Sequence, residues 1–236
     1  MKQTGKLFQI GLKQISKDGM LLVLLPAPIL VGLIFKFAVP YANGILEDHF
    51  SFSLSPWYGI ADGMLVCLTP MFAAMVSAFL LLEERDEGIS SFYQITPAGG
   101  YSYLVARIGI PIIWAFAVTI LATGVFRISG LSATTVLSSS FLSALTGISL
   151  AMMVVSLAGN RVEGLALSKL MGLFFLGLIA VWFIPAPYSY LSAFLPSFWI
   201  GKLIMDGTNV FSFVLGLLSC FIWIIVFTSK FLRRIN

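Results

Sequence analysis

The sequence predicts an all-α, polytopic membrane protein with six transmembrane helices. Its 236 residues are 59% hydrophobic and only 10% charged, whereas soluble domains carry about 25% charged residues. Several uncharged runs approach the length of about 20 residues that crosses a bilayer as a helix. Lysines and arginines flank these runs instead of forming one patch, so the net charge of +4 indicates membrane topology and not a nucleic-acid partner. We expect one transmembrane domain over residues 1–236.

The N-terminal segment, residues 2–17, is predicted to be an amphipathic helix. At helical spacing its apolar side chains share one face and its lysines the opposite face: Phe8, Leu12 and Ile15 against Lys2, Lys6, Lys13 and Lys17. A helix of this kind favours the boundary between lipid headgroups and acyl chains. We therefore expect it to lie in the membrane surface before the first span.

The six spans are placed by the uncharged runs at about residues 19–39, 60–82, 108–126, 135–158, 165–184 and 210–229. Pro26 and Pro28 lie early in the first span and predict a bend there. A loop with Glu47, Asp48 and His49 is expected to join the first two spans. Small residues recur at every fourth position of the fourth span and predict close helix packing: Ser139, Ser143, Gly147 and Ala151.

A broken apolar segment, residues 185–207, precedes the last span. Its prolines are Pro185, Pro187 and Pro196. Backbone groups freed by such breaks must be buried in protein or reach water. We expect two short pieces that dip into the membrane interface, or lie on it, with Tyr188, Tyr190, Phe198 and Trp199 at the level of the headgroups.

The positions of the basic residues predict that both termini lie in the cytoplasm. Eleven of the 14 lysines and arginines fall in four segments that six spans would place on one side: residues 2–17, 83–107, 159–169 and 229–236. The other side has only Lys36, Arg127 and Lys202. Because cytoplasmic loops are enriched in lysine and arginine, we expect a multi-pass protein of the cell membrane with residues 83–107 inside the cell.

The connection between the second and third spans is compact and polar. It reads EERDEGISSFYQITPAGGYSYLVAR, residues 83–107, with five charges first, then Gly88, a short amphipathic piece and Thr96-Pro97. These elements resemble the first cytoplasmic loop of type-2 ATP-binding-cassette exporter permeases, where an acidic cluster, a short helix and a Ser/Thr-Pro turn connect the same two spans. The six-span layout, the basic amino end and LPSFW at residues 195–199 extend the resemblance over the chain.

The resemblance implies that this connection is a cytoplasmic coupling helix on which a separate ATPase subunit docks. The residues assigned to coupling are Glu83, Glu84, Arg85, Asp86, Glu87, Gly88, Phe92, Tyr93, Thr96 and Pro97. A second cytoplasmic contact is expected around Arg161, Glu163 and Lys169. The aromatic side chains would fill a groove on the ATPase, and the acids would pair with its basic residues or with the N-terminal helix. Charge alone would favour the alternative of a solvated loop at the membrane boundary.

Energy is expected to come from the partner. The chain contains no G-x-x-x-x-G-K-[ST] phosphate loop, so we expect a permease subunit that is not an enzyme, with ATP and Mg²⁺ on the ATPase. The resemblance further implies a second six-span subunit, identical or related, so that a homodimer or heterodimer surrounds a central path. Cys67 and Cys220 lie in separate apolar runs and His49 stands alone, so we expect no metal site.

The predicted function is outward movement of an amphipathic or hydrophobic cargo, either a peptide or a drug-like molecule. Asp62, Trp199 and Lys202 are candidate path or exit residues, since ionisable groups near the membrane interior often mark transport routes. Alternatively, Asp62 lies at the outer interface before the second span and Lys202 anchors headgroups. Two other functions stay open: a self-sufficient secondary transporter, which needs intramembrane ionisable groups, and a membrane immunity protein without transport chemistry of its own.

Overall fold

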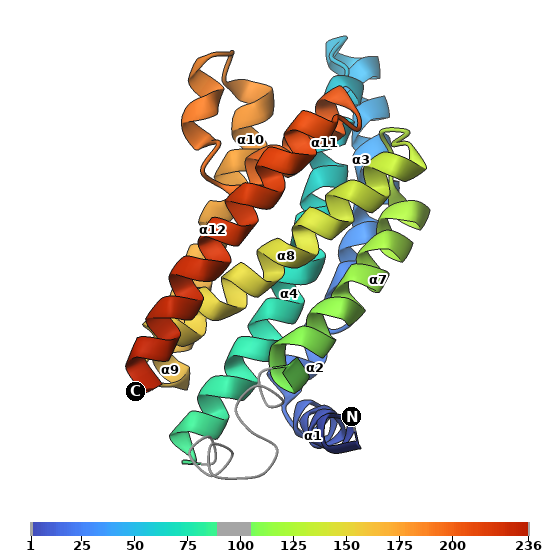
Figure 1. Ribbon diagram of the computed structural model, residues 1–236. Helices are drawn as coiled ribbons and strands as arrows, with labels where there is room; N and C mark the ends of the chain where they lie inside the picture. The colour runs from blue at the N-terminus through green and yellow to red at the C-terminus, as the bar shows by residue number, and fades with distance from the viewer. Residues whose placement is uncertain (1, 89–104, 236) are drawn as a thin grey trace.

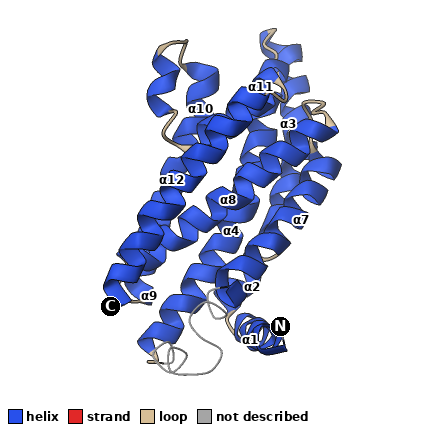
Figure 2. Ribbon diagram, in the orientation of Figure 1, coloured by secondary structure: helices blue, strands red, loops and turns tan. Residues whose placement is uncertain are grey.

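The computed structural model describes residues 2–88 and 105–235, which are helical throughout apart from short connections. Six helical segments within these ranges are long and apolar enough to cross a membrane, which confirms the predicted fold class. The long helices run up and down along one axis, and both chain ends lie at the same end of the bundle (Figure 1). We call this the terminal end and the opposite one the far end. Figure 2 shows how short the described loops between the helices are.

The N-terminal helix α1 (Lys2–Ile15) lies across the terminal end instead of running along the bundle (Figure 1). Its side chain Ile15 is buried with Leu21, Phe79 and Leu80. Asp18 follows and caps α2 (Gly19–Leu24), because its carboxylate accepts hydrogen bonds from two backbone amides of the first turn. The amphipathic helix α1 is therefore attached to the bundle through Ile15.

The first span is broken where the prolines predict a bend. Helix α2 ends at Leu24 and α3 (Ala27–Phe50) begins after Pro26, which has no N–H to continue the ladder. The predicted loop at Glu47, Asp48 and His49 is wrong, since all three lie inside α3. Polarity alone does not end a helix, and the chain turns only at Ser51, which is left-handed with φ 51°.

Helix α8 (Ala133–Leu157) is the most buried of the six segments, 78% over its most apolar window. It packs against α4 (Tyr58–Asp86) and α7 (Ile110–Phe126), the latter preceded by a π-helical turn, η2 (Val105–Gly109). The short connection η1 (Ser55–Trp57) leads into α4. The predicted packing stripe is confirmed, because Ser139, Ser143 and Ala151 are buried, and a Cβ added to Gly147 would lie 3.0 Å from Pro70 Cβ.

Pro70 lies in the middle of α4 and leaves the carbonyl of Val66 without its usual helical donor. The hydroxyl of Ser143 on α8 donates to this carbonyl at 2.6 Å, in the buried interior. A freed carbonyl in a membrane protein must find a partner within the protein. The small residues of α8 therefore allow α4 to pack closely against it, and one of them, Ser143, supplies the hydrogen bond that Pro70 removes from α4.

The fifth span begins earlier than predicted, at Arg161. It comprises α9 (Arg161–Ser168), the 3₁₀ turn η3 (Lys169–Phe174) and α10 (Phe175–Phe183). Asn160 caps α9 through a hydrogen bond from the Glu163 amide at 2.9 Å, which explains the earlier start. The last span, α12 (Val210–Ile235), returns to the terminal end.

The broken segment before α12 folds back into the bundle. It contains η4 (Tyr188–Ser192) and α11 (Pro196–Asp206), and it turns between them. The Phe194 carbonyl at this turn accepts hydrogen bonds from Ser219 Oγ at 2.9 Å and Trp223 Nε1 at 2.7 Å. Ser219 lies nine residues into α12, or about 14 Å along its axis. The segment is thus re-entrant with respect to the far end of the bundle.

The expected position of Phe198 and Trp199 at headgroup level is wrong, since both are buried, at 0% and 6% exposure. They pack with Val66, Leu142 and Leu203 in the core of the far half. Pro196 stands at the start of α11, where its missing N–H costs no hydrogen bond, and the helix then inserts its apolar face between α10, α8 and α12. Tyr188 and Tyr190 are exposed.

We expect Ser143→Ala to lower the free energy of unfolding by about 1–3 kcal/mol, because the Val66 carbonyl becomes a buried acceptor without a partner. In a Pro70→Ala background the same substitution should cost clearly less, since alanine at this position supplies the missing backbone N–H. Thermal unfolding of the four purified proteins in detergent measures both differences. Equal costs of Ser143→Ala in the two backgrounds would show that the hydroxyl does not serve this carbonyl.

Candidate functional site

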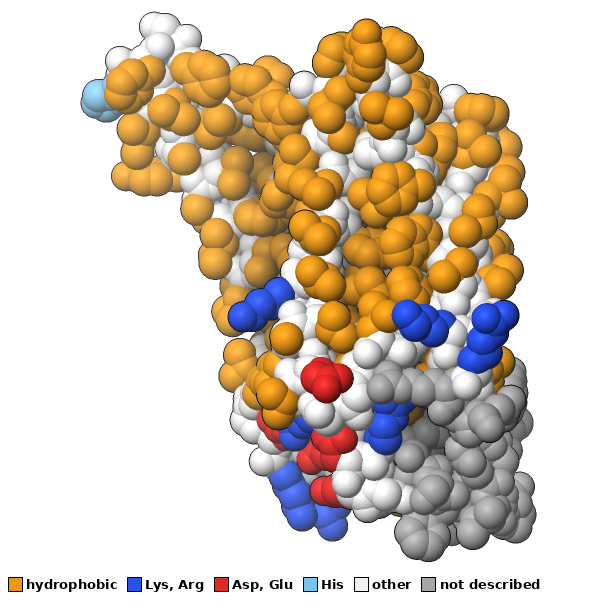
Figure 3. Space-filling view, turned by 90° about the vertical axis from the view of Figure 1, so that its left-hand side faces the viewer, with side chains coloured by type: hydrophobic (Ala, Val, Ile, Leu, Met, Phe, Trp, Pro, Cys, Tyr) orange, Lys and Arg blue, Asp and Glu red, His pale blue; other side chains and the backbone are white. Residues whose placement is uncertain are grey.

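Charged side chains gather at the terminal end of the bundle. On the face shown in Figure 3, the lysines, arginines and acids lie in the lower part and the surface above them is largely hydrophobic. Eight residues from α1, α4, η2, α9 and the start of α2 make contacts there, and we call them the terminal charge network: Gln14, Asp18, Glu83, Glu84, Arg85, Asp86, Arg107 and Arg161.

The centre of the network is a buried ion pair between Arg107 of η2 and Glu84 of α4. The two side chains are each 1% exposed. Arg107 Nε donates to Glu84 Oε2 at 3.1 Å, and Arg107 Nη2 donates to Glu84 Oε1, so the pair is bidentate. Arg107 Nη2 also donates to Gln14 Oε1 at 3.3 Å. These contacts join α1, α4 and η2.

Gly11 explains why α1 can approach this pair so closely. A Cβ atom at Gly11 would overlap the guanidinium of Arg107. Any side chain here would push α1 away from the charge or displace it. Gly11 is therefore the position at which α1 contacts the buried Arg107 side chain.

Arg161, the first residue of α9, forms the second part of the network. Its guanidinium binds the carboxylate of Asp18 and lies 3.3 Å from Glu83 Oε2. Its backbone N–H donates to Asp86 Oδ2 at 2.9 Å. The hydrogen bond from Arg161 lowers the pKa of Asp18 below its ordinary value of 3.8. Through these contacts the start of α2, the end of α4 and the start of α9 are held together.

Arg85 extends the network to α8. Its guanidinium donates to the carbonyls of Ala158 at 2.9 Å and Val155 at 3.2 Å. The last carbonyls of a helix have no donor within the helix, and a cation is also favourable at this end of the helix dipole. Arg85 therefore caps α8 from the end of α4.

The structure places the predicted coupling residues in two groups. Glu83, Glu84, Arg85 and Asp86 make contacts within the chain. The two glutamates pair with arginines of α9 and η2, Asp86 accepts a backbone N–H of α9, and Arg85 binds the end of α8. Helix α1 contributes Gln14 to these contacts. Glu87 and Gly88 are exposed at the end of α4, and Gly88 has a left-handed φ of 73°. The predicted residues Phe92, Tyr93, Thr96 and Pro97 lie outside the described residues.

The predicted second contact around Arg161 is likewise engaged within the chain. Arg161 belongs to the terminal charge network. Glu163 takes part in the cap of α9, because its backbone N–H donates to Asn160 Oδ1 and its carboxylate accepts the Gly159 N–H at 2.5 Å. Lys169 is exposed. Glu163 is exposed as well, so both side chains are accessible to another protein.

Sequence reasoning missed four residues of this region: Gln14, Asp18, Arg107 and Asn160. Two of them carried a readable signal. Asp18 stands just before an apolar run, and Asn160 stands three residues before Glu163, which are both patterns of a helix start. The pairing of Glu84 with Arg107 had no such signal, because 22 residues separate them in the sequence and only the packing of η2 on α4 brings them together.

The three candidate path residues are held by different neighbours at the far half of the bundle. Asp62 is 1% exposed and lies in the second turn of α4, which begins at Tyr58. Its carboxylate accepts hydrogen bonds from the Ile128 and Ser129 amides, both at 2.9 Å, and from the Ser129 hydroxyl. Asp62 thus anchors the turn between α7 and α8.

The other two path candidates are also engaged. Lys202 pairs with Asp206 at 3.1 Å and lies 5.8 Å from the centre of the Tyr190 ring. Trp199 Nε1 donates to the Ala193 carbonyl at 2.7 Å and so fixes the re-entrant turn. Asp62, Trp199 and Lys202 therefore each make contacts that stabilise the fold.

The terminal charge network can transmit a displacement. The connection between α4 and η2 begins beside Asp86 and ends beside Arg107, and both belong to the network. A push on this connection would act directly on α1, α8 and α9, because Arg107, Arg85 and Asp86 bind them. Ion pairs with short, bidentate geometry are suited to such a joint, since they resist both separation and rotation.

We expect Glu84→Gln to destabilise the protein by about 3–5 kcal/mol, because it leaves the buried charge of Arg107 without its partner. The double variant Glu84→Met/Arg107→Met should lose much less stability, since neither charge remains to be buried. Lys202→Met, which breaks a partly exposed pair, should cost about 0–1 kcal/mol. Thermal unfolding in detergent ranks the three. A double variant as unstable as Glu84→Gln would contradict the assignment.

The lowered pKa of Asp18 predicts a dependence on pH. A depressed carboxyl pKa contributes stability above the ordinary value, 3.8, and this contribution disappears as the pH falls through the value in the folded protein. Asp18→Asn keeps a side chain that caps α2 but removes the charge. We expect the wild type to melt at a higher temperature than Asp18→Asn at pH about 7, with the gap closing below pH about 4. A gap that persists in acid would disprove an ionic role.

Comparison with known proteins assigns the family. The family model described as "Fluoroquinolones export permease protein Rv2686c-like" matches residues 11–228. Two curated relatives, the fluoroquinolones export permease proteins MT2760 and Rv2686c from two strains of Mycobacterium tuberculosis, are each 23% identical over 197 residues, which cover 79% of this chain and 75% of the relative. No solved structure matches the chain significantly. The chain belongs to the Rv2686c-like family of export permeases, which are type-2 ATP-binding-cassette permeases.

Proposed function

We propose that this chain is the membrane-spanning subunit of an ATP-driven exporter, and that a separate ATPase subunit docks at its terminal end. The observation that carries the proposal is the terminal charge network. It joins the two ends of the connection between α4 and η2 to α1, α8 and α9 through direct contacts. A subunit moved by a soluble partner needs such a joint between the docking segment and its spans.

In this proposal the terminal end faces the cytoplasm. Both termini lie there (Figure 1), together with the segments that carry most of the basic residues. Lysine and arginine are retained on the cytoplasmic side of a membrane. The far end, with Lys202, Arg127 and the re-entrant segment, would then face the exterior.

The docking surface consists of the residues that the network leaves exposed. Glu84, Arg85 and Arg107 are engaged within the chain and serve as the joint. Glu87 and Lys169 are exposed, and the side chains of Phe92 and Tyr93 would supply the apolar anchor that protein interfaces need. ATP and Mg²⁺ would be bound by the ATPase, and its closure would push this surface toward the bundle.

A second six-span subunit, identical or related, completes the exporter. The first span, Gly19–Phe50, is only 11% buried over its most apolar window, which leaves a long apolar face for lipid or for that partner. The cargo would be an amphipathic, drug-like molecule. The relatives' name, which refers to fluoroquinolones, favours such a molecule over a peptide.

We expect Glu87→Lys combined with Phe92→Ala to weaken binding of the ATPase about thirtyfold, the size of a typical hot-spot loss. The measurement is co-purification of the ATPase with the tagged permease from native membranes, followed by fluoroquinolone accumulation in cells. Asp48→Lys changes the same charge on an exposed residue of α3 at the far end and should have no effect. Normal co-purification and export by the double variant would reject this docking surface.

Replacing the phosphate-loop lysine of the partner ATPase distinguishes an ATP-driven exporter from the alternatives. Export should stop while the complex still forms. Export that continues with the inactive ATPase and responds to an ion gradient would identify a secondary transporter instead.

A further inference from the structure

An apolar groove of about 530 Å³ runs along the outer side of α12, beside the re-entrant turn. Its walls are Phe194 and Trp199 on one side and a stripe of α12 on the other: Leu215, Leu218, Ser219, Ile222, Trp223 and Val226. Leu218, Ile222 and Val226 are more than half exposed. The groove therefore opens sideways, toward the surroundings of the bundle.

The polar atoms near the groove are already paired with each other. Ser219 Oγ and Trp223 Nε1 both donate to the Phe194 carbonyl. The Trp223 ring is held in place by Phe174 and Phe227, at centroid distances of 4.9 and 5.3 Å. The occupant consequently meets a preformed wall without vacant donors, which suits a hydrocarbon chain better than a ligand with polar groups of its own.

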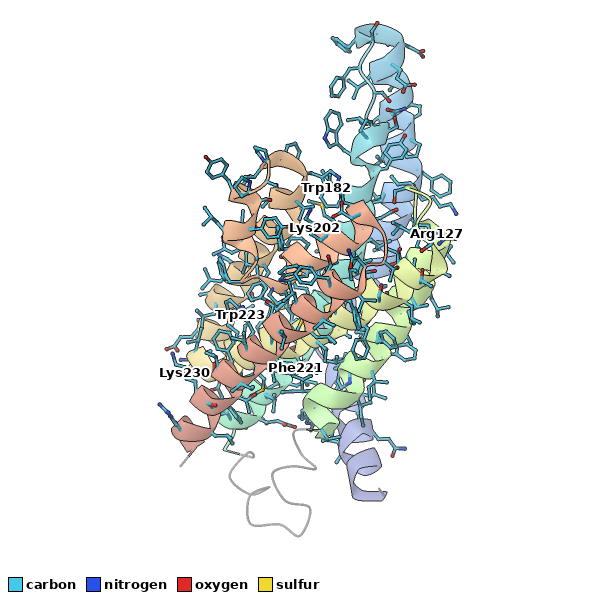
Figure 4. The ribbon with its side chains drawn as sticks, turned by 45° about the horizontal axis from the view of Figure 1, so that its top comes forward. Arg127, Trp182, Lys202, Phe221, Trp223 and Lys230 are labelled. Carbon is cyan, nitrogen blue, oxygen red and sulfur yellow. The ribbon has the colours of Figure 1, made fainter. Side chains whose placement is uncertain are left out.

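Two basic residues continue the same stripe of α12 toward the terminal end. Lys230 lies four residues after Val226, and Arg233 three residues later, which keeps both on the face of the groove. Figure 4 shows Trp223 and Lys230 on one side of α12 and Phe221 on the other. Together with Ser156 and Leu157 at the end of α8, Lys230 and Arg233 line a second cavity of about 390 Å³.

The charge of this cavity is not balanced by the described residues. Lys230 and Arg233 are exposed and form no ion pair with any residue of the described ranges. The sequence of residues 89–104 contains no acid that would neutralise them. Two cations that lie one and two helical turns beyond an apolar groove, without an acidic partner among the described residues, attract an anion with a hydrocarbon tail.

We propose that this surface binds one anionic phospholipid, with an acyl chain in the groove and the headgroup phosphate at Lys230 and Arg233. The dimensions agree with this assignment. From Leu215 to Val226 the groove extends for 11 residues, or about 16 Å, which is close to half of the hydrocarbon core of about 30 Å. Lys230 lies about 6 Å beyond Val226, at the height where the headgroup follows the acyl chain.

The test uses the purified full-length protein in detergent and native mass spectrometry, with phosphatidylglycerol and phosphatidylcholine of identical acyl chains at equal concentrations. The wild type should retain one phosphatidylglycerol with about tenfold preference. Lys230→Gln/Arg233→Gln should abolish the preference, because it removes the charge and leaves the groove. Ile222→Trp should reduce retention of both lipids, because it fills the groove from an exposed position.

Two matched controls should behave as the wild type. Lys13→Gln/Lys17→Gln removes the same charge from exposed residues in the last turn of α1 and just after it. Phe221→Trp adds bulk on the side of α12 away from the groove (Figure 4). Loss of the lipid preference in either control would show a general effect of charge or hydrophobicity and would overturn the assignment, as would its persistence in Lys230→Gln/Arg233→Gln.

Quenching of tryptophan fluorescence by brominated lipid tests the proposal on the wild type, where the result does not depend on how a variant folds. In phosphatidylcholine bilayers containing a small fraction of phospholipid with brominated acyl chains, the bromine quenches nearby tryptophan. Brominated phosphatidylglycerol should quench more strongly than brominated phosphatidylcholine, and Trp223→Phe should remove most of the difference. Equal quenching of the wild type by the two lipids would overturn the proposal, and so would displacement of the lipid by an equimolar fluoroquinolone, which would identify a cargo site.

Discussion

The buried ion pair between Glu84 and Arg107 is the contact on which the terminal end of this permease depends. Both side chains are almost completely withdrawn from solvent, so neither charge is tolerable without the other. The pair fixes η2 against the end of α4, and Gln14 and Gly11 fix α1 against the pair. The acidic run before the connection therefore acts within the chain, where it joins the end of α4 to its neighbouring helices.

A related constraint shapes the rest of the bundle, because backbone groups freed inside a membrane protein require partners in the protein. Ser143 serves the carbonyl that Pro70 leaves open. Ser219 and Trp223 serve the re-entrant turn at Phe194. Asp62 serves the amides between α7 and α8. Each irregular piece of backbone is thus matched by a polar side chain from a neighbouring helix.

The two ends of the bundle are held together by different kinds of contact. The terminal end is cross-linked by charges, so a displacement there is shared by several helices. In the far half, the re-entrant segment is held by hydrogen bonds from Trp199, Ser219 and Trp223 and by the apolar packing of Phe198 and Trp199. Rearrangement there would break fewer ionic contacts than at the terminal end.

The fold class, the number of spans, the break at Pro26 and the polar connection after Glu83 could all be predicted from the sequence, because these depend on composition, periodicity and local breakers. The sequence-based prediction misplaced the end of α3, since a helix continues through polar residues until a turn such as Ser51 interrupts it. The pairing of Glu84 with Arg107, the cap that Arg85 forms on α8, and the position of Phe198 and Trp199 in the core became visible only in the folded structure. These contacts join residues distant in the sequence, and no local pattern encodes which helices meet.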